Sequence, residues 1–539
     1  MTQLKEKIMK KKTVIASLLL LFISINSLTL QAREYGDLIM PSKIEVLYQY
    51  HHNPFQIRSQ ASTRYVIEPT VGYIYTIGQL EQQELLEAHN VIKMTRRLVG
   101  LPGDVQMDEQ LNLTAQYASY INMLNATISH YPSKPNLVSD EAYAIGKEGS
   151  AKSNLAAGFR TISDSILWGY LQDDDIYNLA DVGHRRWLLN PQLQNIGFGY
   201  VDTLVDSSYN GFTATYVFDR SRKETIDYPF IAWPAAGNMP VEFMKTSTPW
   251  SINLGVEYEQ PIKENIRIEL THAQSGKVYR FDAETNSDPS EASNTDFFTT
   301  ENSRYGLEKT LIFRPKLDEV KYAPGDLFYV EVLGIDIKGE EVPISYEVKL
   351  FELNDQPSVW AFEELVEADK ANLIPEMLME AYSEDISRID FTRLLIHGLM
   401  QYTGQTYNEL YETVDVVDTE FKDTTDLDVQ LAARLGIVNG VGDNRFNPTG
   451  GILRQEAATM LYRAGQYLEI EAVQDVQEFS DADKIPNWAK ASVDYVTNIT
   501  DATQGKKVME GVGNQMFAPD RSYTREQAMI TVKRLLNRS

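Results

Sequence analysis

The chain has 539 residues, 43% of them hydrophobic, which is enough for three or four domains that each bury a core. Its 50 basic and 76 acidic residues give a net charge of −26, which repels nucleic acid phosphates and excludes nucleic acid as an expected partner. The absence of cysteine excludes disulfide bonds, thiol catalysis and cysteine-ligated metals.

The N-terminus has the order of a secretory signal. Several lysines precede an apolar run from Val14 to Ile25, and a more polar stretch then ends at Ala32. This order predicts a signal peptide over 1–32, cleaved after Ala32. The apolar run is shorter than the roughly 20 residues that span a bilayer, so no membrane span is expected after cleavage. Residues 33–80 show no clear period and are predicted to form an N-terminal arm.

Helical periodicity begins at residue 81. Leu85, Ala88, His89 and Ile92 fall at the i, i+3, i+4 and i+7 positions that form one face of a helix. Further helical stretches follow as far as residue 189, and the segments 197–201 and 213–218 are typical of strands. The pattern predicts an α/β/α domain over 81–222.

The period changes to two after residue 228. Phe328, Val330 and Val332 alternate with polar residues, and turn signals separate several such runs. Residues 228–353 are therefore predicted to form a small antiparallel β-sandwich that resembles an immunoglobulin domain and acts as a spacer.

The C-terminal third contains a repeated motif. Gly440 and Gly511 each begin a glycine-rich turn, and each lies 14 residues before an arginine at a predicted helix start, Arg454 or Arg525. A third arginine, Arg388, has a similar setting without the glycine turn. The pattern predicts three helical repeats at 357–404, 419–468 and 477–539, of which the first is degenerate.

The second and third repeats carry the sequences FKD at 421–423, FNP at 446–448 and LRQE at 453–456, and FSD at 479–481, PNWA at 486–489 and TRE at 524–526. This region resembles the S-layer homology (SLH) family. The resemblance implies that it binds a secondary cell-wall polysaccharide, which often bears pyruvate ketals. The candidate polysaccharide-binding residues are Arg388, Asp423, Gly440, Arg454, Asp481, Trp488, Gly511 and Arg525.

Chemistry supports this role. A guanidinium binds a carboxylate through two parallel hydrogen bonds, and a helix N-terminus adds free N–H donors. The alternative is that each arginine pairs with the acid two residues further on and that the glycines are only helix stops.

Residues 81–222 contain ISH at 128–130, SNLA at 153–156 and GHRRWLLNP at 183–191. These segments resemble the CAP superfamily, which includes the cysteine-rich secretory and pathogenesis-related proteins. The resemblance implies a cleft at His130, His184, Ser153 and Asn154, in which His130 and His184 bind a divalent metal such as zinc. The acids that would complete the metal site are not matched in this sequence.

Three interpretations of the two histidines stay open: a metal-binding cleft that takes a ligand, structural hydrogen bonding without metal, and a hydrolase in which His184 acts as a base toward Ser129 or Ser153. The sequence thus predicts a secreted protein, held at the wall or S-layer of a Gram-positive-type bacterium by its repeats, that displays a CAP domain for an unknown extracellular ligand. A metal-assisted hydrolase of peptide or wall substrates is the alternative.

Overall fold

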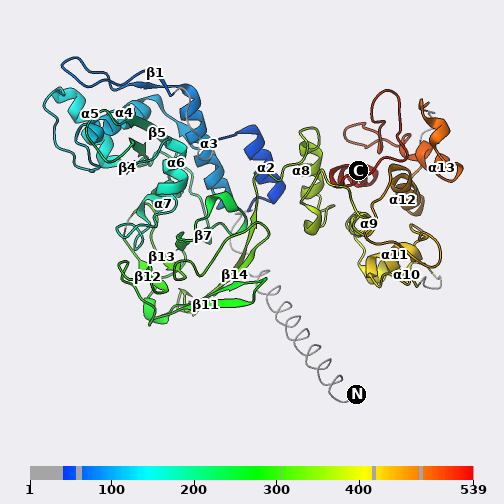
Figure 1. Cartoon of the computed structure of the whole chain (residues 1–539). Helices are drawn as coiled ribbons and strands as arrows, with labels where there is room; N and C mark the ends of the chain where they lie inside the picture. Colours follow the sequence, from blue (N-terminus) through cyan, green and yellow to red (C-terminus); the bar gives the residue numbers. More distant parts are fainter. Residues whose placement is uncertain (1–39, 56–63, 304, 415–419, 473–476, 538–539) are drawn as a thin grey trace. The chain divides into compact units, whose positions relative to one another are not determined.

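The computed structural model describes residues 40–55, 64–303, 305–414, 420–472 and 477–537 (Figure 1). The chain divides into two compact units, Met1–Leu353 and Asn354–Ser539. The predicted signal peptide, 1–32, and the first part of the predicted arm lie outside the described residues. Within the described ranges, no helix has both the length and the apolar character needed to cross a membrane.

The first unit begins with helices around a four-stranded sheet of order β3-β5-β6-β4, in which β3 runs parallel to β5 and the other pairs are antiparallel. Helices α4 and α5 lie beside this sheet (Figure 1). Its elements are α2 (Lys43–His52), β1 (Tyr65–Ile67), β2 (Gln79–Leu80), α3 (Gln82–Leu98), β3 (Gln106–Met107), α4 (Glu109–Leu124), α5 (Asp140–Lys152), β4 (Ser153–Ala157), α6 (Ile162–Ser165), the π-helical η1 (Ile166–Tyr170), α7 (Gly183–Leu188), β5 (Asn195–Asp202) and β6 (Gly211–Tyr216).

Two glycines of β5 let the strand approach α4 closely. A Cβ atom on Gly199 would lie 2.3 Å from the backbone of Ala115, and one on Gly197 would lie 2.2 Å from the backbone of Leu111. We expect Gly199→Ala to lower the free energy of unfolding by about 1–3 kcal/mol, because helix and strand must move apart. Calorimetry of the full chain measures this loss.

The matched control is Gly183→Ala, since a Cβ at Gly183 would meet no atom closer than 3.5 Å. Equal melting temperatures for the two variants would contradict the close-packing argument.

The rest of the first unit contains a five-stranded sheet of order β11-β10-β14-β17-β8 and a four-stranded sheet of order β12-β13-β9-β7. The side chains of Trp233 and Trp250 are fully buried there. The elements are β7 (Phe230–Trp233), β8 (Gly237–Pro240), η2 (Val241–Phe243), β9 (Trp250–Leu254), η3 (Lys263–Asn265), β10 (Arg267–His272), β11 (Lys277–Phe281), β12 (Phe297–Glu301), β13 (Thr310–Arg314), β14 (Leu327–Leu333), the β15 (Asp336–Ile337) and β16 (Glu340–Glu341) hairpin, and β17 (Ile344–Phe351).

A buried arginine joins the two parts of this unit. Arg185 donates hydrogen bonds to the carbonyls of Leu171 and Gln172 at 2.7 and 2.8 Å, and to the carbonyl of Pro249 and Oγ of Ser251 at 2.9 Å each. Because the guanidinium is fully buried, these bonds satisfy a charge that water cannot reach. The helical part and the β-rich part therefore share polar core contacts.

The predicted fold class, an α/β/α CAP domain, an all-β immunoglobulin-like spacer and α-helical repeats, is wrong. The described chain is mixed α/β, with five small sheets and 13 α-helices. Strands β8 and β17 pair in parallel, and an all-antiparallel sandwich contains no parallel pair. In the C-terminal unit, isolated β-bridges join extended segments of different repeats. Alternation identifies strands, but it does not reveal which strands pair. The domain boundaries stay predictions.

The second unit is mainly helical. Its elements are α8 (Phe362–Lys370), η4 (Glu376–Leu378), α9 (Arg388–Thr403), α10 (Tyr407–Glu412), α11 (Leu427–Arg434), α12 (Arg454–Tyr467), η5 (Ala482–Lys484), α13 (Asn487–Val496) and α14 (Arg525–Leu536). Helices α9, α12 and α14 each begin at a motif arginine. Polar caps define two of these starts, because the side chains of Ser387 and Thr524 accept hydrogen bonds from the N3 amides.

Three extended segments close into a ring of backbone hydrogen bonds just before these helices. The amide of Ile386 donates to the carbonyl of Tyr523 at 2.8 Å, and the amide of Tyr523 donates to the carbonyl of Ile452 at 3.1 Å. The amide of Ile452 donates to the carbonyl of Ile386 at 3.2 Å and completes the ring. The ring brings the N-termini of α9, α12 and α14 to equivalent positions around one centre.

Candidate functional site

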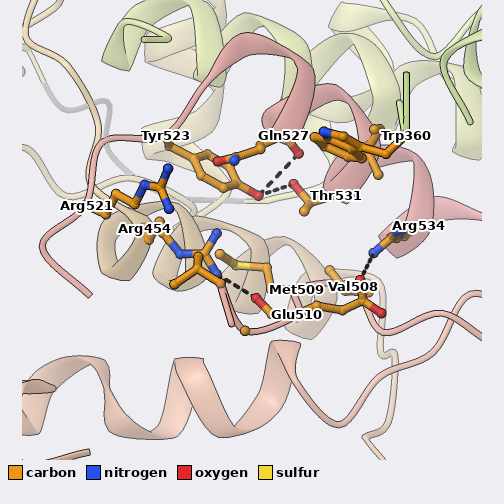
Figure 2. A pocket seen from close by; sticks show the side chains of 13 residues that line it. Trp360, Arg454, Val508, Met509, Glu510, Arg521, Tyr523, Gln527, Thr531 and Arg534 are labelled. Atoms are coloured by element: carbon orange, nitrogen blue, oxygen red, sulfur yellow. Dashed lines mark hydrogen bonds and ion pairs between the residues drawn. The ribbon is translucent and has the colours of Figure 1, made fainter. Parts of the chain in front are cut away.

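A cavity of about 350 Å³ lies within the second unit (Figure 2). This volume is within the usual range of small-ligand sites. All three predicted repeats contribute to it: Trp360 precedes α8, Arg454 begins α12, and the other residues lie in the last glycine turn, in the segments on either side of that turn, and in α14. The lining residues are Trp360, Arg454, Val508, Met509, Glu510, Gly511, Val512, Arg521, Tyr523, Gln527, Ile530, Thr531 and Arg534.

Arg454 is the most deeply placed cation of this cavity, with 5% of the residue exposed. Its Nε donates to the carbonyl of Phe517 at 2.9 Å and its Nη2 to the carbonyl of Glu510 at 2.7 Å (Figure 2). Burial lowers the pKa of Arg454, and the charge of Arg521 also lowers it, whereas Tyr523 and Asp481 act in the opposite direction. A guanidinium nevertheless keeps its proton in proteins, so this charge persists.

The other polar groups of the cavity differ in their partners. Arg534 forms ion pairs with Glu364 at 2.7 Å and with Glu510 at 3.4 Å. Burial raises the pKa of Tyr523 to about 12, so its hydroxyl stays protonated and donates to Oγ1 of Thr531 at 2.8 Å. Among the described residues, Arg454 and Arg521 have no carboxylate partner. The cavity therefore offers two guanidinium groups that form no ion pair with a carboxylate of the described residues, although Asp481 acts on the charge of Arg454 from a greater distance.

Two of the predicted binding residues line this cavity, Arg454 and Gly511. Asp481 instead accepts hydrogen bonds from the amides of Phe517 and Ala518 at 2.9 and 2.8 Å. Its carboxylate therefore holds the third-repeat turn in shape.

Asp423 has the matching role in the second repeat. Its carboxylate accepts from the amides of Phe446 and Asn447 at 2.8 Å each, and these bonds lower the pKa of Asp423. Gly440 supplies this turn with a left-handed residue at φ 75°, and a Cβ there would meet the carbonyl of Arg445 at 2.6 Å.

The remaining predicted residues do not line the cavity. Arg388 pairs with Glu456 at 3.1 Å, and Arg525 lies 4.0 Å from Asp390. In both pairs the acid and the arginine belong to different repeats. The alternative interpretation of the sequence instead paired each arginine with the acid two residues further along the same repeat. Trp488 lies on the first turn of α13 and is 57% exposed.

Sequence reasoning missed Trp360, Arg521 and Gln527 as candidate site residues. The register of the repeats contained signals for two of them. Trp360 is followed by alanine, as Trp488 is in the third repeat, and Arg521 stands where the second repeat has Gly450. A residue-by-residue comparison of the repeats would have singled out both positions.

The four predicted cleft residues of the first unit differ in their hydrogen-bond partners. Nδ1 of His184 lies 2.7 Å from Oδ1 of Asp173, and the side chain of Asn154 donates to the carbonyl of His184 at 2.9 Å. Burial alone would lower the pKa of His184, but the Asp173 carboxylate outweighs burial and raises it.

Nδ1 of His130 lies 2.8 Å from the carbonyl of Ser150. Oγ of Ser153 is buried without a hydrogen-bond partner. Across the described ranges, no group of three or more histidine and acidic side chains is arranged to hold a metal ion. Zinc binding at His130 and His184 stays a prediction.

Comparison with known proteins identifies one part of the chain. Residues 428–458 match the family model of the S-layer homology domain. An endoglucanase of Bacillus sp. (strain KSM-635) is 27% identical over 187 residues, which cover 33% of this chain and 18% of the endoglucanase. An amylopullulanase of Thermoanaerobacterium thermosulfurigenes and the exoglucanase XynX of Acetivibrio thermocellus are each 24% identical over 190 residues, which cover 34% of this chain and 10% and 16% of those proteins.

The chain therefore contains an S-layer homology domain, which confirms that part of the sequence prediction. The domain and its relatives place the protein at the cell surface of a bacterium, in its wall or S-layer. The matched regions span less than a fifth of each relative. None of these matches supports the resemblance of residues 81–222 to the CAP superfamily.

Proposed function

We propose that the C-terminal unit, residues 354–539, holds the protein to a polysaccharide of the bacterial cell wall and that the cavity around Arg454 binds this glycan. The observation that carries the proposal is the pair of guanidinium groups, Arg454 and Arg521, that face the cavity without a carboxylate partner among the described residues. Each can bind an anionic group on a sugar through two parallel hydrogen bonds.

The cavity also suits the neutral part of a sugar. Trp360 lines it and is 51% exposed, so an indole face is available for the apolar side of a sugar ring. Met509 and Ile530 add apolar surface, while Gln527 offers an amide. This mixture of apolar surface and a few fixed polar groups is typical of ligand sites.

A local site is needed because the whole chain is acidic. With a net charge of −26, the protein is repelled by an anionic glycan at long range. The two cations act at short range, where ionic screening is weakest. Acidic substituents on the glycan, such as pyruvate ketals, are part of the proposal.

The first unit, which without the predicted signal peptide comprises residues 33–353, is proposed to be the part displayed outside the wall, where it meets an extracellular ligand. The relatives are named as glucan-degrading enzymes, but the matched length of about 190 residues is close to that of the C-terminal unit alone. A metal-assisted hydrolase is the second candidate, supported by the 2.7 Å contact between His184 Nδ1 and Asp173, which would orient His184 as a base. Metal content and loss of hydrolysis in His184→Ala test it.

Sedimentation of the full chain with purified wall sacculi tests the anchoring proposal. We expect the protein to pellet with intact sacculi and to stay in solution when the polysaccharide has first been stripped from them. Equal pelleting with both preparations would show that peptidoglycan, or another wall component, is the partner instead.

A further inference from the structure

Two arginines of the second unit have the same setting in successive repeats. The guanidinium of Arg388 lies 5.4 Å from the ring centre of Phe446, and that of Arg454 lies 5.0 Å from the ring centre of Phe517. In each case the phenylalanine belongs to the glycine turn of the following repeat. The two positions can therefore be compared residue by residue.

The charged residues around the two arginines differ. The register that aligns Arg454 with Arg525 also aligns Glu456 with Gln527 and Gly450 with Arg521. Glu456 lies 3.1 Å from Arg388 and compensates its charge. Around Arg454, the neutral Gln527 replaces that acid and Arg521 adds a second cation. These two exchanges make the Arg454 cavity more positive by two charges.

The third arginine also faces an acid. Arg525 lies 4.0 Å from Asp390, which occupies the third position of α9 just as Glu456 does in α12. In the described part of the chain, Arg454 is thus the one motif arginine of the three that lacks a facing carboxylate. Its cavity is also the one described above.

An unsatisfied acceptor lies beside these cations. Oε1 of Gln527 is buried and has no hydrogen-bond partner, although Gln527 lines the cavity. A buried carbonyl oxygen without a donor costs free energy unless a ligand supplies one. Figure 2 shows Gln527 together with Arg454 and Arg521 among the side chains that line the cavity. A sugar hydroxyl next to an anionic substituent would satisfy both Gln527 and the arginines.

We infer that Gln527 and Arg521 determine the specificity of the Arg454 cavity, and that they restrict binding of the anionic group of the sugar, a carboxylate or a phosphate, to this one of the three arginines. The inference rests on the proposed wall anchoring through this cavity and adds the residues that set its charge. Arg388 and Arg525 then stabilise contacts between repeats.

Gln527→Glu tests this assignment without disturbing the helix. Residue 527 is the third position of α14, where its backbone amide donates to Oγ1 of Thr524. Glutamate at this position is favourable in a capping box, so the variant is expected to fold. The new carboxylate would occupy Arg454 and repel the anionic ligand. Arg521→Gly removes the second cation by using the residue that the second repeat has there.

The experiment is calorimetric titration of the full chain with soluble polysaccharide released from sacculi. We expect Gln527→Glu and Arg521→Gly each to weaken binding at least about tenfold. Glu456→Gln, the matched control at the equivalent position, should not weaken it. Polysaccharide with chemically reduced carboxyl groups and polysaccharide treated with phosphatase distinguish the two sources of negative charge.

Failure of the inference is distinguishable from failure of the anchoring proposal. If the unaltered chain does not bind the polysaccharide, anchoring through this glycan is wrong. If it binds and Gln527→Glu, with an unchanged melting temperature, binds equally well, only the assignment to the Arg454 cavity is overturned. A loss in Glu456→Gln as large as that in Gln527→Glu would overturn it too.

Discussion

Replacement of Arg454 with alanine is expected to weaken binding of the full chain to wall polysaccharide by about 30-fold or more, which corresponds to roughly 2 kcal/mol. The reason is that Arg454 is 95% buried, lines the cavity and keeps a charge that forms no ion pair with a carboxylate of the described residues. Arg388→Ala should change the affinity by less than about threefold, because Glu456 already compensates Arg388. Equilibrium binding to the soluble polysaccharide measures both.

A control must separate lost binding from lost structure. Arg454 also donates to the carbonyls of Phe517 and Glu510, so its removal can loosen the third-repeat turn. Arg454→Lys keeps the charge but loses the planar guanidinium, and it should recover only part of the affinity. Full affinity in Arg454→Ala, with the fold confirmed by its melting temperature, would contradict the role of this residue.

Replacement of Glu364 with alanine is expected to destabilise the C-terminal unit by about 3–5 kcal/mol. Glu364 lies on α8 with a side chain that is 1% exposed, and it accepts two hydrogen bonds of 2.7 Å from Arg534 of α14 and one of 2.8 Å from Lys506. Its removal would leave the buried cations Arg534 and Lys533 without this partner. Calorimetry of the full chain should show the transition of this unit about 10 °C lower.

The neighbouring Glu363 provides the matched control, since it lies on the same helix and is exposed. Glu363→Ala should leave the melting temperature within about 2 °C of that of the unaltered chain. A similar temperature for both variants would show that the charged network contributes little.

The same network gives stability a defined pH dependence. Burial alone would raise the pKa of Glu364, but hydrogen bonds from Arg534 and Lys506 lower it. In the same way, hydrogen bonds from Thr503 and Gln504 outweigh burial and lower the pKa of Asp501. A carboxyl group whose pKa is lower in the folded than in the unfolded chain stabilises the fold at any pH above its unfolded pKa, which is near 4.5 for Glu364. This stabilisation is lost as the pH falls through the pKa of the folded state. Glu364→Gln should therefore flatten the acid limb of the stability profile.

Part of the fold could be predicted from local pattern. Helices that begin at Arg454 and Arg525 were predicted from the motif and its turn, and both begin there. The fold class was wrong because strand pairing depends on contacts that are distant in the sequence, such as β8 with β17. Helix α2, capped by Ser42 and Glu45, lies in the segment that showed no clear period.

The candidate site was predictable only in part for the same reason. Arg454 and Gly511 belong to repeated motifs, and both line the cavity. Trp360 and Gln527 come from the first and third repeats, and only the folded ring brings them near Arg454. The motif could not show that the Asp481 carboxylate accepts hydrogen bonds from backbone amides, because an acid that recurs in two repeats is consistent with ligand binding and with turn stabilisation alike.

Hydrogen–deuterium exchange of the full chain, with and without soluble wall polysaccharide, tests the central claim most directly. We expect the glycan to slow exchange in the segment 508–523, which contains seven of the residues that line the Arg454 cavity, and to leave the equivalent second-repeat segment 437–452 unchanged. Slower exchange at 437–452, or protection confined to residues 81–222, would contradict the assignment of the wall-binding site to this cavity.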